Sequence, residues 1–270
     1  MASSPFKYIN KLQDKRVLVF GGSSGIGLAV AEAALEHGAV VGLVSSNAEK
    51  LAEVAEQLKT TYGSHINDGQ LSTFSIDLTL PREQLEPELK QAFAQFAPNS
   101  AKIHHVVFTA GNVPSMPGLD QVTADDFKDL LVVRTVAPTI IASVLKSEKY
   151  MESSTASSIT LTGAVNASRP LPGMPVQGPA IGAAIEGLCR GLAATLAPIR
   201  VNTVLAGTFD TALTARLSAE VKQKLAQRTM LKKIGKVEDI AEAYIYFMKD
   251  ESATGVSLVS DNGFMVSPGM

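Results

Sequence analysis

The sequence predicts a doubly wound α/β sandwich, in which a parallel sheet of about seven strands is covered by helices on both faces. The first observation is that short β-rich runs alternate with longer amphipathic stretches along the whole chain. The second is that 270 residues, 46% of them apolar and 19% charged, are enough to bury a substantial core. Because parallel strands need crossover helices on both sheet faces, the alternation itself favours this architecture.

Six short runs of β-branched and aromatic residues are expected to form strands, and a seventh strand is expected near the C-terminal end. In chain order they are Arg16–Phe20, Val40–Ser45, Leu71–Ile76, Ile103–Phe108, Ser158–Thr162, Arg200–Leu205 and, last, Ser257–Val259.

The stretches between the runs carry apolar residues three and four positions apart, which is the spacing of one buried helix face. The expected helices are Gly25–His37, Ala48–Tyr62, Arg82–Phe96, Ala124–Lys146, Ile181–Ala197 and Val237–Met248. A further charged helix is expected within Ser218–Arg228, where it forms either a substrate lid or a solvated face.

The 21 glycines and 13 prolines stand at the ends of apolar runs, so they punctuate one compact fold and mark no linker. We therefore expect a single domain over residues 1–270. Within it, residues 15–150 form the cofactor half and residues 151–264 form the substrate half.

Charge and cysteine content exclude several functional classes. The formal net charge of -2 gives no excess that would favour nucleic acid or an anionic membrane. Cys189 is the single cysteine and lies in an apolar helical stretch, which indicates a buried thiol and a reducing compartment. The sequence shows no signal peptide, and Arg134 interrupts its most apolar stretch, Leu130–Val144, so we expect a cytoplasmic protein.

A glycine-rich turn joins the first strand to the first helix in a Rossmann-like way. It reads Gly21-Gly22-Ser23-Ser24-Gly25-Ile26-Gly27, with glycines at G-x-x-x-G-x-G spacing. Glycines let the backbone approach a pyrophosphate, and the N-terminus of the next helix favours its charge. A plain helix-start turn is the alternative, but the strand and helix on either side favour a dinucleotide site.

The ends of the second and third strands bear on the choice of cofactor. The second ends in Ser45-Ser46-Asn47, where an NAD-preferring protein usually carries an acid for the ribose hydroxyl. Hydroxyl and amide groups can donate to a 2′-phosphate, so NADP(H) is favoured. After the third strand, Asp77 and Leu78 are expected beside the adenine, where Asp77 either accepts from its amino group or caps a helix.

Several motifs together resemble the short-chain dehydrogenase/reductase family over Lys15–Phe264. After the fourth strand the chain reads Phe108-Thr109-Ala110-Gly111, and the sixth strand begins Arg200-Val201-Asn202. The C-terminal part is similar to the family in the order and spacing of Gly235–Ile240, Asp250–Ser252, Thr254-Gly255 and Val259–Phe264. The resemblance implies cofactor contacts at Ala110, Gly111, Gly207, Thr208, Asp210 and Thr211. Asp210 could equally be a helix N-cap.

Aligning this sequence with the family shows that the catalytic tetrad is missing, because none of its four residues is present here. Gly178 stands where the tyrosine belongs, Gly182 where the lysine belongs, and Thr162 or Gly163 where the serine belongs. Arg134 replaces the helix asparagine. In the family, the tyrosine and the lysine supply the proton that carbonyl reduction needs. Because both are missing, this protein cannot reduce a carbonyl by the family's route.

Two reactions remain possible without a proton donor. Hydride transfer to a cyclic iminium gives a neutral amine with no proton transfer, and an intramolecular cycloaddition needs only a shaped apolar pocket. The segment Asn166–Pro175 could wall such a pocket, with Arg169, Pro170, Leu171 and Met174 facing the substrate, or it could be a rigid surface loop.

These departures resemble a branch of the family found in fungal indole-alkaloid pathways, the bifunctional reductase/Diels-Alderases of malbrancheamide and paraherquamide type. The branch implies NADPH-dependent reduction of a prenylated, dipeptide-derived cyclic iminium, followed by stereoselective intramolecular [4+2] cycloaddition. Catalytic roles would fall to Arg134 and to an acid at position 166, which is Asn166 here. Arg134 alternatively pairs with Asp129 or with a neighbouring subunit.

Other functions stay open at this stage. A non-catalytic NADP(H) sensor or scaffold would also lack the tetrad, and Tyr150 could be an unrecognised acid for carbonyl reduction. The resemblance also implies a homotetramer or homodimer, assembled through the helices Ala124–Lys146 and Ile181–Ala197. The small-molecule substrate is the expected partner, with no metal.

Overall fold

The computed structural model describes residues 7–67, 69–111, 116–147 and 149–268 and has one seven-stranded sheet. The strand order is β3-β2-β1-β4-β5-β6-β7, and every neighbouring pair is parallel. The strands are β1 (Arg16–Phe20), β2 (Val40–Ser45), β3 (Leu71–Ser75), β4 (His105–Phe108), β5 (Ser158–Ala164), β6 (Arg200–Ala206) and β7 (Ser257–Ser260). The predicted doubly wound α/β fold is confirmed.

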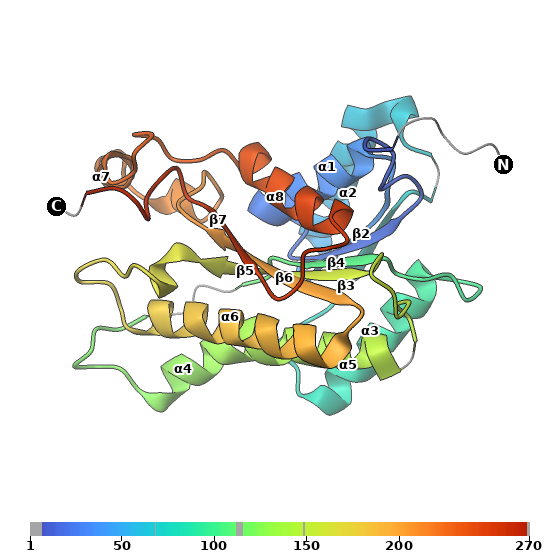
Figure 1. The fold of residues 1–270 in the computed structure, drawn as a ribbon, viewed down its shortest axis with the longest axis horizontal. Helices are drawn as coiled ribbons and strands as arrows, with labels where there is room; N and C mark the ends of the chain where they lie inside the picture. The colour runs from blue at the N-terminus through green and yellow to red at the C-terminus, as the bar shows by residue number, and fades with distance from the viewer. Residues whose placement is uncertain (1–6, 68, 112–115, 148, 269–270) are drawn as a thin grey trace.

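Two layers of helices enclose the sheet, as Figure 1 shows. The longer helices are α1 (Gly25–Glu36), α2 (Ala48–Tyr62), α3 (Arg82–Phe96), α4 (Ala124–Leu131), α5 (Ala137–Ser147), α6 (Gln177–Leu196), α7 (Ala219–Gln227) and α8 (Val237–Lys249). Helices α1, α2 and α8 cover one face, and α3, α5 and α6 cover the other.

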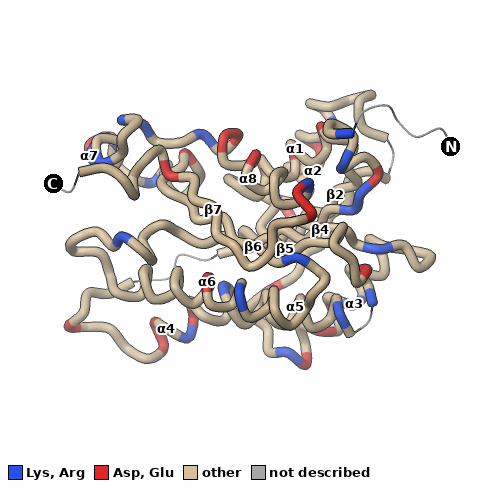
Figure 2. Tube along the Cα trace, in the orientation of Figure 1, with Lys and Arg blue, Asp and Glu red and all other residues tan. Residues whose placement is uncertain are grey.

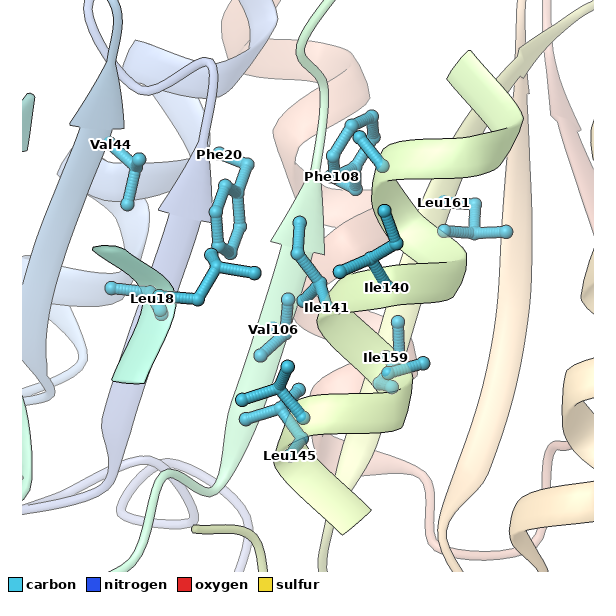
Figure 3. Close-up of a cluster of buried hydrophobic side chains, with 14 of the residues drawn as sticks. Leu18, Phe20, Val44, Val106, Phe108, Ile140, Ile141, Leu145, Ile159 and Leu161 are labelled. Atoms are coloured by element: carbon cyan, nitrogen blue, oxygen red, sulfur yellow. The ribbon is translucent and has the colours of Figure 1, made fainter. Parts of the chain in front are cut away.

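Each sheet face buries its own apolar cluster because both faces of a parallel sheet must be shielded from water. In the cluster drawn in Figure 3, Leu18 and Phe20 of β1 lie with Val106 and Phe108 of β4, next to Ile141 of α5. The rings of Phe20 and Phe108 stack with centroids 5.9 Å apart. This packing fixes the ends of β1 and β4. These are the neighbouring strands at which the order of strand addition reverses.

The helix predicted as Ala124–Lys146 is interrupted by a π-helical turn, Val132–Val136, that carries Arg134. Such single π-turns occur often at functional sites. Helix α6 begins at Gln177, four residues before the predicted start at Ile181, and β4 begins at His105 rather than Ile103. Ile103 instead forms an isolated bridge with Met151.

Charged residues of both signs are spread over the outer helices and loops, as seen in Figure 2. Among the described residues, one helical stretch, Ala124–Ser147, is long and apolar enough to cross a membrane. Half of its apolar window is buried inside the fold. This is the behaviour of a core helix in the layer over the sheet.

The prediction of a buried Cys189 thiol is confirmed, and the adjacent His104 and His105 are hydrogen-bonded within the fold. Cys189 is buried, and burial raises the pKa of its thiol. His105 lies at the amino end of β4, where its Nδ1 is 2.9 Å from the Ser158 hydroxyl. His104 accepts a hydrogen bond from the Arg16 amide at 3.0 Å.

Candidate active site

The glycine-rich turn at the end of β1 has a backbone that only glycine can supply. Gly21 and Gly25 have positive φ angles of 85° and 55°. A Cβ on Gly27 would lie 2.3 Å from the Gly21 carbonyl oxygen and 2.4 Å from Thr109 Oγ1. Thr109, which sequence reasoning did not single out, donates to the Phe20 carbonyl at 3.0 Å and so ties this turn to the end of β4.

The N-terminus of α1 is free to bind an anion. Its N-cap, Ser24, makes no side-chain capping bond, and the first turn, which contains Ile26, carries no acid. The amides of a first helical turn have no acceptor within the helix. By contrast, α2 and α4 are capped by the side chains of Asn47 and Thr123. The turn therefore fits a pyrophosphate, which the α1 dipole also favours.

The predicted ribose-binding residues meet beside this turn. The hydroxyls of Ser23 and Ser45 are 3.0 Å apart and hydrogen-bonded, and Ser46 is exposed. Asn47 Oδ1 accepts from the Lys50 amide at 2.9 Å, so only its amide NH₂ group is left for a ligand. Ser45, Ser46 and Asn47 at the end of β2 thus offer donors and no carboxylate.

Asp77 and Leu78 follow β3 at the same edge of the sheet. Asp77 Oδ1 accepts from the amide and the hydroxyl of Thr79, at 2.9 and 2.7 Å. The alternative that Asp77 caps a helix is wrong, because Pro81 is the N-cap of α3. Leu78 is buried in the core next to it.

The loop after β6 reaches back over the glycine turn. A Cβ on Gly25 would lie 3.3 Å from the Thr211 methyl group, so Thr211 packs on this turn. Thr208 is held by its carbonyl, which accepts from the Gly235 amide at 3.0 Å. Gly207 fits closely, because a Cβ there would be 2.6 Å from the Asp261 Cα. The structure thus brings the loop after β6, which carries predicted cofactor contacts, onto the predicted pyrophosphate turn.

Asp210 lies in the same loop but does not cap a helix, so that alternative is wrong. The N-caps of the next two helical segments are Leu213 and Ser218. The Asp210 carboxylate is exposed and lies 3.9 Å from Lys222 Nζ of α7. No residue of α7 is buried, so α7 is a loosely packed cover beside this loop.

Arg134 lies directly against Gly111, which follows β4 together with Ala110. A Cβ on Gly111 would be 2.4 Å from one terminal nitrogen of the Arg134 guanidinium and 2.6 Å from its central carbon. The π-turn thus directs the Arg134 side chain to the carboxyl end of β4. Desolvation lowers the pKa of this guanidinium, which keeps a positive charge at neutral pH nonetheless.

Asn166 lies in a short 3₁₀ turn after β5, against the first turn of α6. Its Nδ2 is 3.5 Å from the Met174 sulfur and would be 3.2 Å from a Cβ on Gly178. Its Oδ1 is buried and has no hydrogen-bond partner. The predicted catalytic position 166 therefore faces the position predicted for the family tyrosine.

The positions predicted for the serine and lysine of the tetrad are closed by packing. A Cβ on Gly182 would lie 2.7 Å from the Ala167 Cβ, and one on Gly163 would lie 2.7 Å from the Leu205 side chain. Thr162, the other candidate for the serine, has its hydroxyl 2.6 Å from the buried Tyr244 hydroxyl of α8. Helix α6 and the end of β5 approach too closely here for a longer side chain.

None of the five tyrosines is in α6, where the family tyrosine is expected. Tyr150 donates to the Lys90 carbonyl at 3.3 Å and packs on Phe93, so the hypothesis of Tyr150 as the acid is wrong. Its own carbonyl accepts from the Ile103 amide, at the amino end of the sheet. Tyr62 and Tyr246 donate to Glu36 and Asp250, Tyr8 lies in the exposed N-terminal segment, and Tyr244 is bonded to Thr162.

The predicted pocket loop after Asn166 is divided between two roles. Arg169 donates to the Phe264 carbonyl and to Ser267, and its guanidinium lies 4.9 Å from the centre of the Phe264 ring. It therefore holds the C-terminal segment. Pro170 is exposed, whereas Leu171 and Met174 are half-buried, and of these Met174 contacts Asn166.

Sequence reasoning missed Gln177, the first residue of α6. Its side chain is 0% exposed, and its Nε2 donates to the Pro117 carbonyl at 3.3 Å. Its Oε1 has no hydrogen-bond partner within the described part of the chain. The sequence shows only a polar residue at the start of an Ala- and Gly-rich helix, so nothing there indicates that it is buried.

Comparison with a family model agrees with this geometry. The model of the SDR-like Rossmann domain matches residues 8–267.

Curated relatives match at full length. The chain is 36% identical over 267 residues to the short-chain dehydrogenase/reductase fsr5 of Gibberella fujikuroi, covering 97% of this chain and 98% of that protein. It is also 36% identical over 261 residues to the short-chain dehydrogenase/reductase malC of Malbranchea aurantiaca, covering 94% and 96%.

Solved structures give the same result. The MalC reductase/Diels-Alderase from Malbranchea aurantiaca superimposes with a TM-score of 0.88 at 34% identity, covering 96% of this chain and 100% of that one. A short-chain dehydrogenase/reductase from Serratia marcescens superimposes with a TM-score of 0.80 at 27% identity, covering 94% and 99%.

Proposed function

Because this chain belongs to the short-chain dehydrogenase/reductase family, we propose that it is a nicotinamide-dependent oxidoreductase that reduces a cyclic iminium. The same pocket then promotes a stereoselective intramolecular [4+2] cycloaddition of the product. The full-length similarity to the MalC reductase/Diels-Alderase supports both activities. The resemblance to the fungal indole-alkaloid branch favours a prenylated, dipeptide-derived substrate.

The observation that carries this proposal is the closed space where the family keeps its proton donor. Gly178 and Gly182 pack against Asn166 and Ala167, so α6 brings neither a hydroxyl nor an ammonium group to the site. Carbonyl reduction would leave an alkoxide without an acid. An iminium avoids this problem because its carbon accepts the hydride while the C=N π pair becomes the nitrogen lone pair, and no proton moves.

The residues around the first strand fit a nicotinamide dinucleotide. Gly21, Gly25 and Gly27 shape the turn, the uncapped N-terminus of α1 binds the pyrophosphate, and Thr211 packs on the turn. A reduced nicotinamide bound there supplies the hydride. The protein orients the substrate so that its electrophilic carbon lies within reach.

Arg134 and Asn166 are proposed to position the substrate. The Arg134 guanidinium donates to an oxygen of the substrate from the end of β4, where Gly111 leaves it room. Asn166, in the turn after β5 and against the first turn of α6, keeps the shape, without the charge, of the acid expected there. Leu171 and Met174 supply apolar surface that keeps the diene and the alkene folded together for cycloaddition.

NADP(H) is the proposed cofactor. Ser45, Ser46 and Asn47 offer donors at the end of β2 and place no carboxylate near a 2′-phosphate. We also infer a cytoplasmic homo-oligomer, dimer or tetramer, acting on a small alkaloid precursor.

A fluorescence titration with NADPH and with NADH tests the cofactor site. The wild type is expected to bind NADPH more tightly, and Ser46→Asp is expected to shift the ratio of dissociation constants toward NADH by roughly tenfold. Ser153→Asp, which adds the same charge at an exposed position before β5, is the matched control and should leave the ratio unchanged. If the protein binds neither nucleotide, the proposal that it is a reductase is wrong.

A second experiment measures NADPH oxidation with cyclic iminium ions and with the corresponding ketones. Iminium reduction without ketone reduction is the expected result. Asn166→Asp is expected to raise kcat/KM for iminium reduction, because a carboxylate binds the cationic substrate more strongly than an amide does. An unchanged kcat/KM in Asn166→Asp would remove the catalytic role of position 166, and cofactor binding without any turnover would favour the sensor.

A further inference from the structure

Two amide residues, Asn166 and Gln177, lie where the loop after β5 joins α6. Gln177 is the first residue of α6, and the next residue, Gly178, has its Cβ position 3.2 Å from Asn166 Nδ2. The two residues thus belong to one small cluster at the junction of β5 and α6, on the carboxyl edge of the sheet.

The orientation of the Gln177 amide is set by its neighbour. Its Nε2 donates to the Pro117 carbonyl at 3.3 Å, and a flipped amide would bring two oxygens together. Asn166 Nδ2 likewise faces the Met174 sulfur, a weak acceptor. Both amide nitrogens are therefore engaged, and both oxygens are left to accept.

Neither oxygen has a donor among the residues that the structure describes. Asn166 Oδ1 and Gln177 Oε1 are both buried and without a hydrogen-bond partner, and the Gln177 side chain is 0% exposed. A buried acceptor without a donor lowers stability, and each such group in a folded protein calls for a physical reason. Two of them in one cluster indicate a site built for a ligand that brings the donors.

We propose that Asn166 Oδ1 and Gln177 Oε1 form a paired acceptor site that recognises an N–H group of the cationic substrate. Amide oxygens accept from ammonium, iminium or amide N–H groups and offer nothing to a fully substituted nitrogen. This inference assumes the proposed iminium reductase and specifies its substrate as one that carries an N–H donor next to the reacting part.

Access to the site passes through the loop before α6. Solvent does not reach the two oxygens in this structure, so the substrate must displace part of residues 168–176. Pro170, Pro172 and Gly173 of this loop are exposed, and Gly173 has a φ of 77° with no atom within 4 Å of its Cβ position. Loops with this character open and close over substrates.

The test compares two cations with the same ring system, one with two N–H groups and one with two N-methyl groups in their place. Binding of 1,2,3,4-tetrahydroisoquinolinium and of its N,N-dimethyl derivative to the protein with NADP⁺ is measured by calorimetry. The wild type is expected to bind the N–H cation roughly tenfold more tightly. In Gln177→Met, which keeps the side-chain length and removes the amide, this ratio is expected to fall to about one.

Controls separate the acceptor site from general stability. Thr160→Val removes a buried, unpartnered hydroxyl in the middle of β5 and should keep the tenfold ratio. If Gln177→Met does not fold, Asn166→Leu is expected to lower the ratio in the same way. A ratio that persists in the folded variants, or a wild type that does not distinguish the two cations or binds neither, overturns the inference.

The binding assay needs no hydride transfer, so the two proposals fail separately. Discrimination between the cations without iminium turnover would count against the reductase. Iminium turnover without discrimination would count against the acceptor site alone.

Discussion

Gly111 and Arg134 act as a pair at the scale of single residues. The guanidinium occupies the space that a side chain at position 111 would fill, within 2.4 Å of the Cβ position. The obstacle is the far end of a flexible side chain, so a methyl group there would displace the guanidinium and leave the backbone in place. Gly111 thus determines whether the Arg134 guanidinium can lie at the end of β4.

Gly111→Ala is expected to leave the free energy of unfolding within about 1 kcal/mol of wild type and to lower kcat/KM by roughly tenfold or more. The reason is that Arg134 can no longer lie along the end of β4. Denaturant unfolding and steady-state iminium reduction are the two measurements.

The control is the same substitution at Gly191, where nothing lies within 4 Å of the Cβ position and activity should be retained. Arg134→Ala and the double variant complete a cycle. If Gly111 acts only through Arg134, the double variant is no slower than Arg134→Ala, and additive losses would contradict the coupling.

Much of this candidate site could be predicted from the identities of single residues. The glycines of the first turn, the absence of an acid after β2 and the position of Arg134 are all readable from the chain. The role of Arg169 was not, because its partners Phe264 and Ser267 lie almost a hundred positions away. Gln177 was missed for the same reason, since burial of a polar residue depends on its tertiary surroundings.

At the scale of elements, α6 is shaped by its glycines. Gly182 lies on the inner face, where a Cβ would be 2.7 Å from the Ala167 Cβ, whereas Gly191 faces open space. The helix therefore approaches the turn after β5 closely on one side and leaves small residues exposed on the other.

Gly182→Ala is expected to lower the free energy of unfolding by about 1–3 kcal/mol, because a methyl group in a tightly packed contact forces the backbone to move. Gly191→Ala, in the same helix, is expected to raise it by about 0.5–1 kcal/mol through helix propensity. Urea unfolding of both variants measures the difference. Equal effects at the two positions would show that α6 does not pack closely on Ala167.

Elements predicted from periodicity agree best where the pattern is local. Helix α2 and helix α3 have the predicted bounds, as have β1 and β2. The π-turn at Val132–Val136 was not predicted, because one additional residue in a helical turn hardly alters apolar spacing. The start of α6 was placed late, since Gln177 and Gly178 give no helical signal.

At the scale of the whole molecule, the half-buried His104 and the buried His105 link folding to pH. Burial lowers the pKa of His104 from 6.5 to about 4, and burial lowers the pKa of His105 well below 6.5. Below pH 6.5 the unfolded chain therefore binds protons that the folded chain excludes. The stability from these groups is present above pH 6.5 and is lost as pH falls toward 4.

The free energy of unfolding is expected to fall between pH 6.5 and 5.5, by up to about 1.4 kcal/mol per pH unit for each additional proton bound by the unfolded chain. His104→Asn, which keeps an acceptor for the Arg16 amide, is expected to reduce this slope. His65→Asn changes an exposed histidine and serves as the control. A slope that His104→Asn leaves intact would contradict the assignment.

Assembly is the second property at this scale. Ala183, Gly187, Arg190 and Ala194 are exposed along one side of α6, which permits a second helix to pack closely. Light scattering is expected to give a dimer or tetramer, and Ala183→Glu is expected to shift it toward the monomer. A wild type that is monomeric at all concentrations would remove this prediction.

The sequence by itself determined the parallel sheet, the family and the dinucleotide turn, because strand periodicity, glycine spacing and helix-start signals are encoded in contiguous residues. Only the tertiary structure decided that Gly182 excludes a lysine, that Arg134 lies on Gly111, and that Gln177 is buried with an unpartnered oxygen. Each of these facts is a contact between segments far apart in the chain. Close packing of such segments fixes which side chains fit, and no local pattern records it.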